Sequence, residues 1–359
     1  MLLTQLHLKH FRCFSDLVLN LEKPLVIIEG FNGCGKTSFL EAVHYLCYLR
    51  SFRTHTPREL IQFGHEGFFI KALFTQHDNV CPQELQVGFS GKRRLVKINQ
   101  KPIESYKELM DFYRIVTLTE SDLDLIHGDP ETRRAFIDQA IMLYDPAHAN
   151  TIRDLRHCVE QRNALLQRSV SSDEFNTWTE QLFYKSVAIQ DTRRTTLVAL
   201  ERTAQTLIAD HFDNAFSIGF EYKAKRIPDD QSYETFRAAY PHLLQEEQKM
   251  NRSLFGAHVD DILITFHDKR SKQYASRGQQ KLIVLLIKIA QIKELLRKKG
   301  PAVFLLDDFM TDFDERRIVQ LLTVLRELDI QLIFTTPLSS HILTHELKAH
   351  GAQTIKLPH

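Results

Sequence analysis

The chain has 359 residues, 43% of them hydrophobic and 25% charged, and its formal net charge is +1 at neutral pH. These values exclude a disordered or fibrous chain, and the length allows two domains or one domain with a large insertion. A net charge near zero neither requires nor excludes a nucleic-acid partner, and because no apolar run approaches the ~18 residues of a membrane span, we expect a soluble, cytoplasmic protein with no membrane partner.

The first strongly patterned segment is a glycine-rich loop between an apolar run and a helical pattern. Residues 2–11 alternate like a strand, residues 25–28 predict a buried strand, and GFNGCGKT follows directly before a helix. This is the spacing of a Walker A phosphate loop, whose backbone N–H groups bind phosphate while its lysine reaches the β- and γ-phosphates and its threonine ligates Mg²⁺. The predicted ATP-binding residues are Gly30, Phe31, Asn32, Gly33, Cys34, Gly35, Lys36 and Thr37.

Basic residues gather in three segments, one of which is predicted to form a hairpin at residues 91–101. Each cluster alone is more often a solvated face than a ligand site. Together they motivate the hypothesis that the chain binds the DNA backbone without reading bases. The clusters are Arg50, Arg53 and Arg58; Lys92, Arg93, Arg94, Lys97 and Lys101; and Lys223, Lys225 and Arg226.

From residue 129 to about 214 apolar residues recur at helical spacing. Ile152, Leu155 and Val159 share one face of a helix, and residues 197–207 repeat apolar side chains every three or four positions. Such a stripe is more often the packed core of a helical hairpin than a ligand groove. We therefore predict an inserted helical, arm-like domain over residues 121–215.

The last part of the chain returns to alternating strands and helices. Strands are predicted at residues 260–268, 302–308 and 331–336, and a helix at about 315–328. Asp307 ends an apolar strand, as the Walker B carboxylate does, and is placed to hold the hydration shell of Mg²⁺ opposite Thr37. Asp308, the next residue, is placed to orient or deprotonate an attacking water.

Ser276 to Gln279, with the sequence SRGQ, stand at the start of an apolar helix. Taken alone they suit a helix capped by Ser276, but they also match the Ser-Gly-Gly-Gln signature of ABC-type ATPases with one substitution. Their place, beyond the helical region and before the Walker B strand, favours the signature. We predict an α/β fold in which an ABC-type P-loop ATPase domain is built from both chain ends, residues 1–120 and 216–359, around the helical insertion.

The sequence resembles the RecF family of bacterial DNA replication and repair ATPases over essentially its whole length. The motifs that carry the resemblance are LHLKHFRCF, GFNGCGKTSFLEAVHYL, RSFR, GDPETRRAFID, GAHVDD, SRGQQK and LLDD. The resemblance implies an ATP-dependent homodimer that binds single-stranded and double-stranded DNA at gaps and duplex junctions. It also implies a role in the response to DNA damage, with RecO and RecR as partners in loading the RecA recombinase.

The resemblance also implies roles for single residues. Lys36, Asp308 and Ser276 would be catalytic, with Asp308 as the hydrolytic base, while Thr37 and Asp307 would hold Mg²⁺. The signature residues of one subunit would contact the ATP of the other. The further nucleotide-binding residues implied are Arg12, Ser276, Gly278, Gln279 and the D-loop aspartate Asp314.

Some positions depart from the ABC pattern. Arg277 replaces a signature glycine, and Asp308 is one methylene shorter than the usual glutamate, so we expect a weak, DNA-stimulated ATPase. No glutamine occurs between residues 101 and 139 to form a Q-loop, and Thr335 or Thr336 stands where a switch histidine is common; His258 is expected to be structural. An ATP-gated DNA-binding scaffold with negligible turnover remains an alternative, and an ABC transporter subunit a less favoured one.

Overall fold

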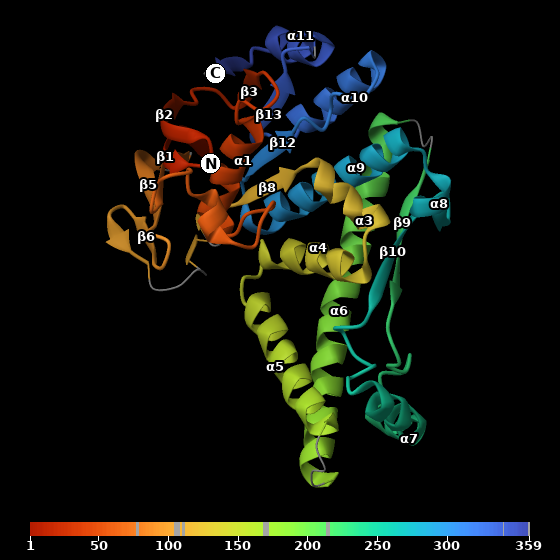
Figure 1. Cartoon of the computed structure of the whole chain (residues 1–359). Helices are drawn as coiled ribbons and strands as arrows, with labels where there is room; N and C mark the ends of the chain where they lie inside the picture. Colours follow the sequence, from red (N-terminus) through yellow and green to blue (C-terminus); the bar gives the residue numbers. More distant parts are fainter. Residues whose placement is uncertain are drawn as a thin grey trace. The chain divides into compact units, whose positions relative to one another are not determined.

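The computed structural model describes residues 1–76, 79–103, 108–109, 112–167, 172–212, 216–339 and 341–357. The chain forms two compact units, one made of residues 1–122 and 284–359 and the other of residues 123–283 (Figure 1). The first unit is therefore built from both ends of the chain, and the second is inserted between them. No helix in the described ranges is long and apolar enough to cross a membrane.

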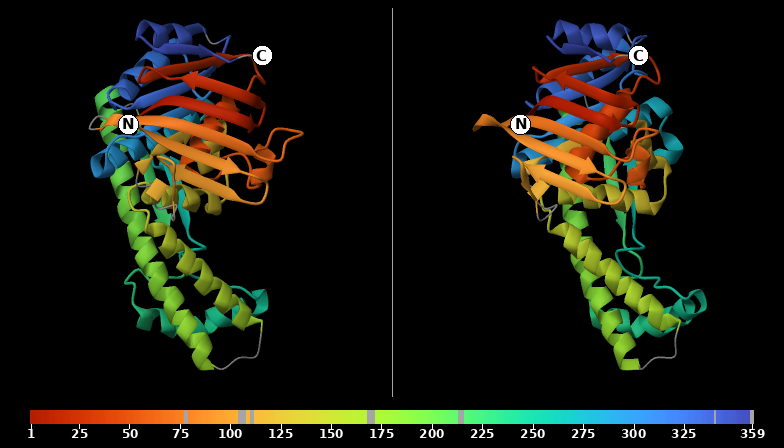
Figure 2. Two further views of the ribbon diagram at one scale, coloured as in Figure 1. Left: turned by 90° about the vertical axis from the view of Figure 1, so that its left-hand side faces the viewer. Right: turned by 60° about the vertical axis from the view of Figure 1, so that its left-hand side comes forward.

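The first unit contains an antiparallel sheet of six strands in the order β2-β1-β4-β5-β6-β7, seen face-on in Figure 2. Its strands alternate buried and exposed residues, and the buried side packs on helix α1 (Lys36–Tyr48). The short helix η1 (Pro57–Leu60) lies in the connection between β2 and β4 that also contains α1. The strands are β1 (Leu2–Phe11), β2 (Phe14–Asn20), β4 (Phe68–Gln76), β5 (Asn79–Phe89), β6 (Arg94–Ile98) and β7 (Lys101–Pro102).

A second sheet of the same unit has five parallel strands in the order β14-β3-β13-β12-β8. Its central strands are buried almost throughout, as expected for a parallel sheet covered on both faces. Ligands of such open sheets bind beyond the carboxyl ends of the strands. The elements are β3 (Leu25–Gly30), β8 (Ile115–Leu118), β12 (Val303–Asp307), β13 (Gln331–Pro337), β14 (Gln353–Lys356), α10 (Glu315–Arg326) and α11 (His341–Ala349).

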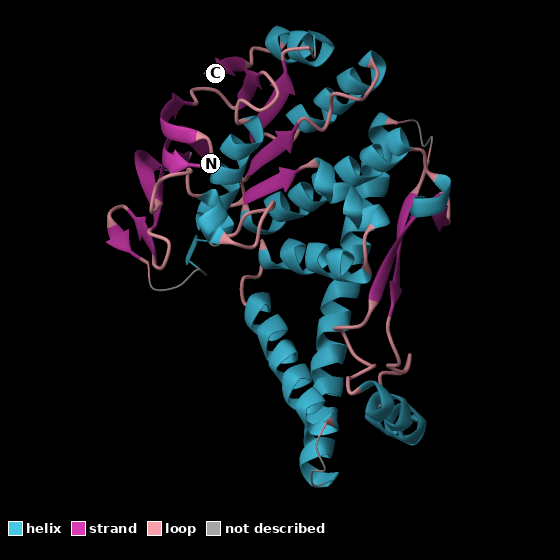
Figure 3. Cartoon of the chain, in the orientation of Figure 1, coloured by secondary structure: helices cyan, strands magenta, loops and turns pink. Residues whose placement is uncertain are grey.

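The second unit is mainly helical, with one small sheet in the order β11-β10-β9 (Figure 3). Helices α5 and α6 form a long antiparallel pair. The helix α9 (Arg277–Lys299) begins in this unit and continues into the first. The short helix η2 (Glu120–Leu123) lies where the chain passes from the first unit to the second. The other elements of the second unit are α3 (Asp124–His127), α4 (Pro130–Met142), α5 (His148–Leu166), α6 (Ser172–His211), β9 (Ile218–Lys223), α7 (Tyr233–Met250), β10 (Asp261–Phe266), β11 (Lys269–Arg270) and α8 (Ser271–Tyr274).

Two buried polar clusters hold the second unit together. Arg162 is fully buried, and its guanidinium forms an ion pair with Glu247 and lies over the ring of Phe255 at 4.9 Å. In the middle of α6, Arg193 donates two hydrogen bonds to Asp138 at 2.9 and 2.8 Å and a third to a backbone carbonyl of residue 257 at 2.7 Å. Buried charges are tolerated only when paired in this way, so both arginines fix the packing of this unit.

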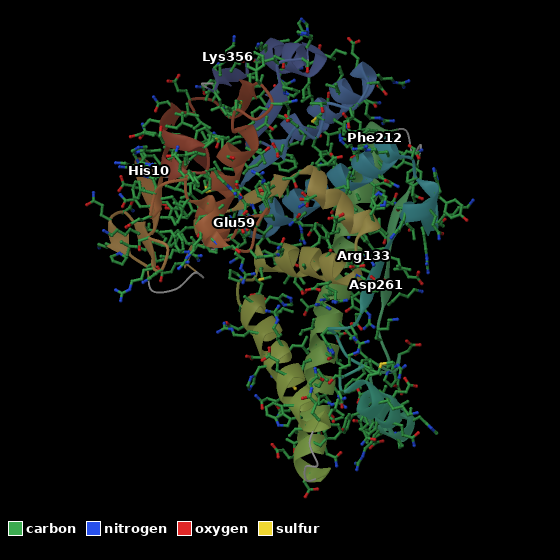
Figure 4. The ribbon with its side chains drawn as sticks, in the orientation of Figure 1. His10, Glu59, Arg133, Phe212, Asp261 and Lys356 are labelled. Carbon is green, nitrogen blue, oxygen red and sulfur yellow. The ribbon has the colours of Figure 1, made fainter. Side chains whose placement is uncertain are left out.

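The observed division differs from the predicted boundaries, because residues 216–283 pack with the inserted unit. Strands β9 and β10 pair along their whole length, from Ile218 opposite Phe266 to Lys223 opposite Asp261. Arg133 on α4 then bonds the Asp261 carboxylate on β10 at 2.8 Å, and Figure 4 shows these two side chains pointing toward one another. The C-terminal contribution to the first unit thus begins at residue 284 rather than 216.

Candidate nucleotide site

The loop between β3 and α1 has the conformation that its glycines permit. Gly33 and Gly35 have φ values of 86° and 103°, a left-handed region that side chains rarely adopt. A Cβ on Gly35 would also lie 2.6 Å from the sulfur of Cys13 and 2.6 Å from the ring of Phe14. A glycine is therefore required at position 35 both by the backbone and by its neighbours.

The first turn of α1 is suited to bind an anion. Its N-cap is Gly35, which has no side chain to occupy the free N–H groups, and the described first turn contains no acidic residue. The N–H groups of this turn and the positive end of the helix dipole favour a negatively charged ligand. A phosphate group has the charge and the acceptor oxygens that this turn can bind.

Lys36 lies on the loop itself. Its ammonium donates hydrogen bonds to the carbonyls of Gly30 at 3.2 Å and Phe31 at 3.3 Å, and its side chain is 5% exposed. The same ammonium is 3.7 Å from a carboxylate oxygen of Asp308. These contacts place a buried positive charge beside the helix N-terminus, where the β- and γ-phosphates of a nucleotide would lie.

Thr37 and Asp307 come together although they are 270 residues apart in sequence. The Thr37 hydroxyl donates to Asp307 Oδ1 at 3.1 Å, and the Thr335 hydroxyl on the neighbouring strand donates to the same oxygen at 2.8 Å. Burial raises the pKa of Asp307, although these two hydrogen bonds act in the opposite direction. Two protein oxygens would suit Mg²⁺, which keeps several water or phosphate ligands.

Asp308 has a left-handed backbone conformation and a carboxylate oxygen without a hydrogen-bond partner among the described groups. Its φ is 47°, and its N–H donates to the Thr335 hydroxyl at 2.9 Å. Oδ1 of Asp308 is buried without a hydrogen-bond partner among the described groups, so it can accept a proton or a water. Burial raises the pKa of this carboxyl, partly opposed by Lys36, which suits a proton acceptor.

The signature residues form a reciprocal cap at the start of α9, within the second unit. The Ser276 hydroxyl accepts from the N–H of Gln279 at 3.4 Å, and the Gln279 side chain accepts from the N–H of Ser276 at 2.8 Å. This is the capping box expected of a serine followed by glutamine three positions later. Ser276, Gly278 and Gln279 are all exposed, so the turn is accessible from solvent.

Two other predicted residues have partners within the first unit. The carboxylate of Asp314 caps α10 by accepting from the N–H of Arg317 at 2.8 Å. The guanidinium of Arg12 donates to both oxygens of Glu41 at 2.8 and 2.7 Å. Sequence reasoning missed Glu41, a fully buried carboxylate on α1 whose presence on an apolar helix face could have indicated a buried cation.

Some side chains of the basic clusters contact other side chains of the chain itself. The guanidinium of Arg94 lies 5.5 Å from the centre of the Tyr45 ring and its Nε is buried, whereas Arg93 is exposed. Arg226 pairs with Glu246 at 2.7 Å. The two adjacent arginines therefore have different surroundings, and whether either contacts DNA stays a prediction. His258 is half-buried, and burial lowers its pKa to about 4.

Comparison with known proteins identifies the family. The model of the RecF/RecN/SMC N-terminal domain matches residues 2–352. The DNA replication and repair protein RecF of a Cyanothece species is 31% identical over 95% of this chain and 93% of its own length. The chain belongs to the RecF family. The RecF protein of Prosthecochloris aestuarii is 28% identical over 98% of this chain and 97% of its own length.

Solved structures give the same fold. The structure of the recombination mediator protein RecF with ATP, from the RecFOR pathway, has a TM-score of 0.82 at 22% identity and covers 93% of this chain and 91% of that one. An SMC head bound to the C-terminal winged-helix domain of ScpA has a TM-score of 0.57 at 15% identity, covering 95% and 91%. The predicted ABC-type α/β fold, shared by RecF proteins and SMC heads, is confirmed.

Proposed function

We propose that this RecF-family chain is an ATP-dependent DNA-binding protein of replication and repair, which hydrolyses ATP slowly and dimerises when ATP is bound. The observation that carries the proposal is the meeting of Lys36, Thr37, Asp307 and Asp308 at the carboxyl edge of one parallel sheet. Distant segments supply a phosphate-binding loop, a metal-binding pair and a proton acceptor. Few functions other than nucleotide binding need all three.

Each residue has a defined task in this proposal. The first-turn N–H groups of α1 and the Lys36 ammonium bind the β- and γ-phosphates, and Lys36 leaves its loop carbonyls to do so. Thr37 and Asp307 would hold Mg²⁺, which would offset the negative charge of the phosphates. Asp308 orients the attacking water and accepts its proton through the carboxylate oxygen that has no other partner.

The signature residues act on a nucleotide held by a second copy of the chain. Ser276 and the N-terminus of α9 are exposed, and the Ser276 hydroxyl, which accepts from Gln279 in the capping box, can still donate to a γ-phosphate. Gln279 and Gly278 stand in the same turn, and Asp314, at the start of α10, is proposed to face the dimer interface as the D-loop aspartate does in relatives. ATP, but not ADP, would then join two chains.

Light scattering with ATP, ADP or no nucleotide tests this proposal. Ser276→Arg should bind ATP like the wild type, because Ser276 belongs to the second unit and not to the phosphate loop, yet remain monomeric. Lys36→Met is the matched contrast, since it should lose ATP binding and the dimer together. A Ser276→Arg protein that dimerises normally with ATP would refute the role of the signature in trans.

DNA binding is proposed to depend on phosphate contacts, at single-stranded gaps and their duplex junctions. Arg93→Gln should reduce the slope of log affinity against log salt by about 0.7–0.9, the value for one phosphate contact. Arg94→Gln is the comparison, because its guanidinium rests on Tyr45 and should leave the slope unchanged. Equal slopes for Arg93→Gln and wild type would remove this hairpin from the DNA surface. RecO, RecR and RecA are the partners that membership of the family suggests.

A scaffold that binds ATP without appreciable turnover is the second candidate function. It is favoured by Asp308, whose short carboxylate already lies 3.7 Å from the Lys36 ammonium and could remain paired with it. Steady-state phosphate release, measured with and without gapped DNA, separates the two candidates. If DNA stimulates phosphate release by the wild type and Asp308→Asn abolishes that release, the chain is an ATPase. If the wild type releases phosphate no faster than Asp308→Asn, the scaffold is supported.

A further inference from the structure

Directly before the signature lies an exposed aromatic ring covered on one face by a cation. The side chain of Tyr274 on α8 is 60% exposed, and the Lys269 ammonium on β11 lies 5.0 Å from the centre of its ring. A tyrosine this exposed gains little from burial within its own chain. Its second face and its edge are open to another molecule.

The backbone that carries this ring is tied to the signature by local hydrogen bonds. The β10–β11 hairpin turns at His267 and Asp268, whose φ values of 50° and 59° are those of a tight type I′ turn. Immediately after it, the N–H of Ala275 donates to the carbonyl of Ser271 at 3.1 Å, and Ser271 is fully buried. Tyr274, two residues before Ser276, therefore has little freedom to move away from the signature turn.

A second tie runs through α3. The Lys272 ammonium donates to the carbonyl of His127 at 2.8 Å, and the ring of His127 bonds the side chain of Gln280 at 2.8 Å. Helix α8 and the first turn of α9 are thus anchored to the same residue. Because one histidine holds both, Tyr274 and Ser276 form a single preorganised surface.

The segment is also strongly basic in a chain whose net charge is only +1. Residues 267–281 contain five basic residues and one acidic residue, and all but one of the basic side chains are exposed. An aromatic face beside cations complements a ligand that has a planar base and several negative charges. The exposed basic residues are Lys269, Arg270, Lys272 and Arg277.

Gly278 supports close approach by an external group. A Cβ built at this position meets nothing within 4 Å, so the packing of the described chain does not require glycine there. Glycine in a helix instead lowers helix stability by about 1 kcal/mol relative to alanine. The missing side chain leaves room for a partner to approach the first turn of α9.

We propose that Tyr274 and Lys269 form a nucleotide-docking surface that acts in trans: the Tyr274 ring packs on the nucleoside of an ATP held by a second copy of the chain, while Lys269 and Arg270 approach its phosphates. The inference rests on the proposed ATP-dependent dimer and adds the residues that recognise the partner's nucleotide. Nucleotide is favoured over DNA because the surface is continuous with Ser276, whose turn is suited to a γ-phosphate.

The test compares two exposed tyrosines of the second unit. Tyr274→Ala should raise the dimer dissociation constant with ATP at least tenfold, while monomer affinity for a fluorescent ATP analogue stays at the wild-type value. Tyr184→Ala is the matched control, because Tyr184 is 54% exposed but lies on α6, where its ring contacts Tyr233. Tyr274→Phe keeps the ring and should restore the dimer, which excludes a simple folding defect.

The remaining outcomes separate this inference from the function on which it rests. If wild type does not dimerise with ATP, the proposed function fails. If wild type dimerises, Ser276→Arg does not, and Tyr274→Ala does, only the docking surface is refuted. If Tyr274→Ala dimerises normally but binds single-stranded DNA more weakly without nucleotide, the surface belongs to DNA and the inference is overturned.

Discussion

Replacement of Thr335 by valine removes one hydroxyl, nearly preserves the shape of the side chain, and should disturb both aspartates of the nucleotide site. The hydroxyl donates to Asp307 at 2.8 Å and accepts from the N–H of Asp308 at 2.9 Å, and Thr335 is only 1% exposed. In valine the Asp308 N–H loses its acceptor, and Asp307 keeps only the hydrogen bond from Thr37. One substitution thus loosens the proposed metal ligand and the proposed proton acceptor together.

The expected cost follows from these two bonds. A buried donor left unpaired costs about 1–3 kcal/mol, and a hydrogen bond to a charged group contributes about 1.5–3 kcal/mol. A loss of about 3 kcal/mol would lower the Tm by about 6–12 °C for a unit of this size. Because the lost hydrogen bond lowers the pKa of Asp307, that pKa should rise further above its usual value, and Mg²⁺-dependent ATP binding should fail at a higher pH than in wild type.

Thermal unfolding and ATP binding titrated against Mg²⁺ across pH 5–8 measure both effects. Thr335→Ser is the control, because it keeps the hydroxyl and loses only a methyl group. Its ATP binding should therefore fail at the same acidic pH as in the wild type. If the valine and serine variants share one Tm and one pH profile, the hydroxyl does not position the aspartates and the reasoning is refuted.

Four further substitutions address three separate parts of the molecule. Asp308→Asn should keep ATP and Mg²⁺ binding, cut hydrolysis about 100-fold or more, and prolong ATP-dependent residence on DNA. Asp307→Asn should instead lose both hydrolysis and stable dimers. Equal DNA residence times for wild type and Asp308→Asn would exclude hydrolysis as the release step. Arg162→Ala should lower the free energy of unfolding by about 3–5 kcal/mol in urea titrations, because it leaves the Glu247 charge buried alone, and a loss below about 1 kcal/mol would contradict this. Burial lowers the pKa of His44 to about 3. The free energy of unfolding should therefore be unaffected by His44 above pH 6.5 and should fall between pH 6.5 and 3, by up to about 1.4 kcal/mol per pH unit. His44→Gln should flatten this part of the profile of unfolding free energy against pH, and an unchanged slope would argue against a buried neutral imidazole.

Features with a local signal could be predicted from the sequence. The phosphate loop and the Walker B strand each combine an apolar run with an adjoining polar motif, and their strands, helix and loop glycines occur where the pattern placed them. Ser276 and Gln279 likewise carry their capping box in a spacing of three residues. The roles assigned to these residues stay predictions until the variants are measured.

Features that depend on distant pairing could not be predicted. Strands β9 and β10 are separated in sequence by α7. Nothing in the sequence of either strand indicates that the two strands pair with each other or that they pack on the inserted helices. The bond from Thr335 to two aspartates requires knowing that β13 lies beside β12, which residue spacing does not reveal. The stacking of Arg94 on Tyr45 was hidden for the same reason, because a basic run looks alike whether its members face solvent or an aromatic ring.

The attachment of α6 has a mechanical consequence. The helix is 40 residues long, and Arg193 fixes it near its middle through Asp138. From that point to Ser172 the helix extends about 30 Å, at 1.5 Å per residue. The outer half is also tied to α5, because Arg162 donates to Thr179 at 3.1 Å. A rotation of about 5° at Arg193 would carry the far end of α6 through roughly 3 Å, and α5 would have to move with it.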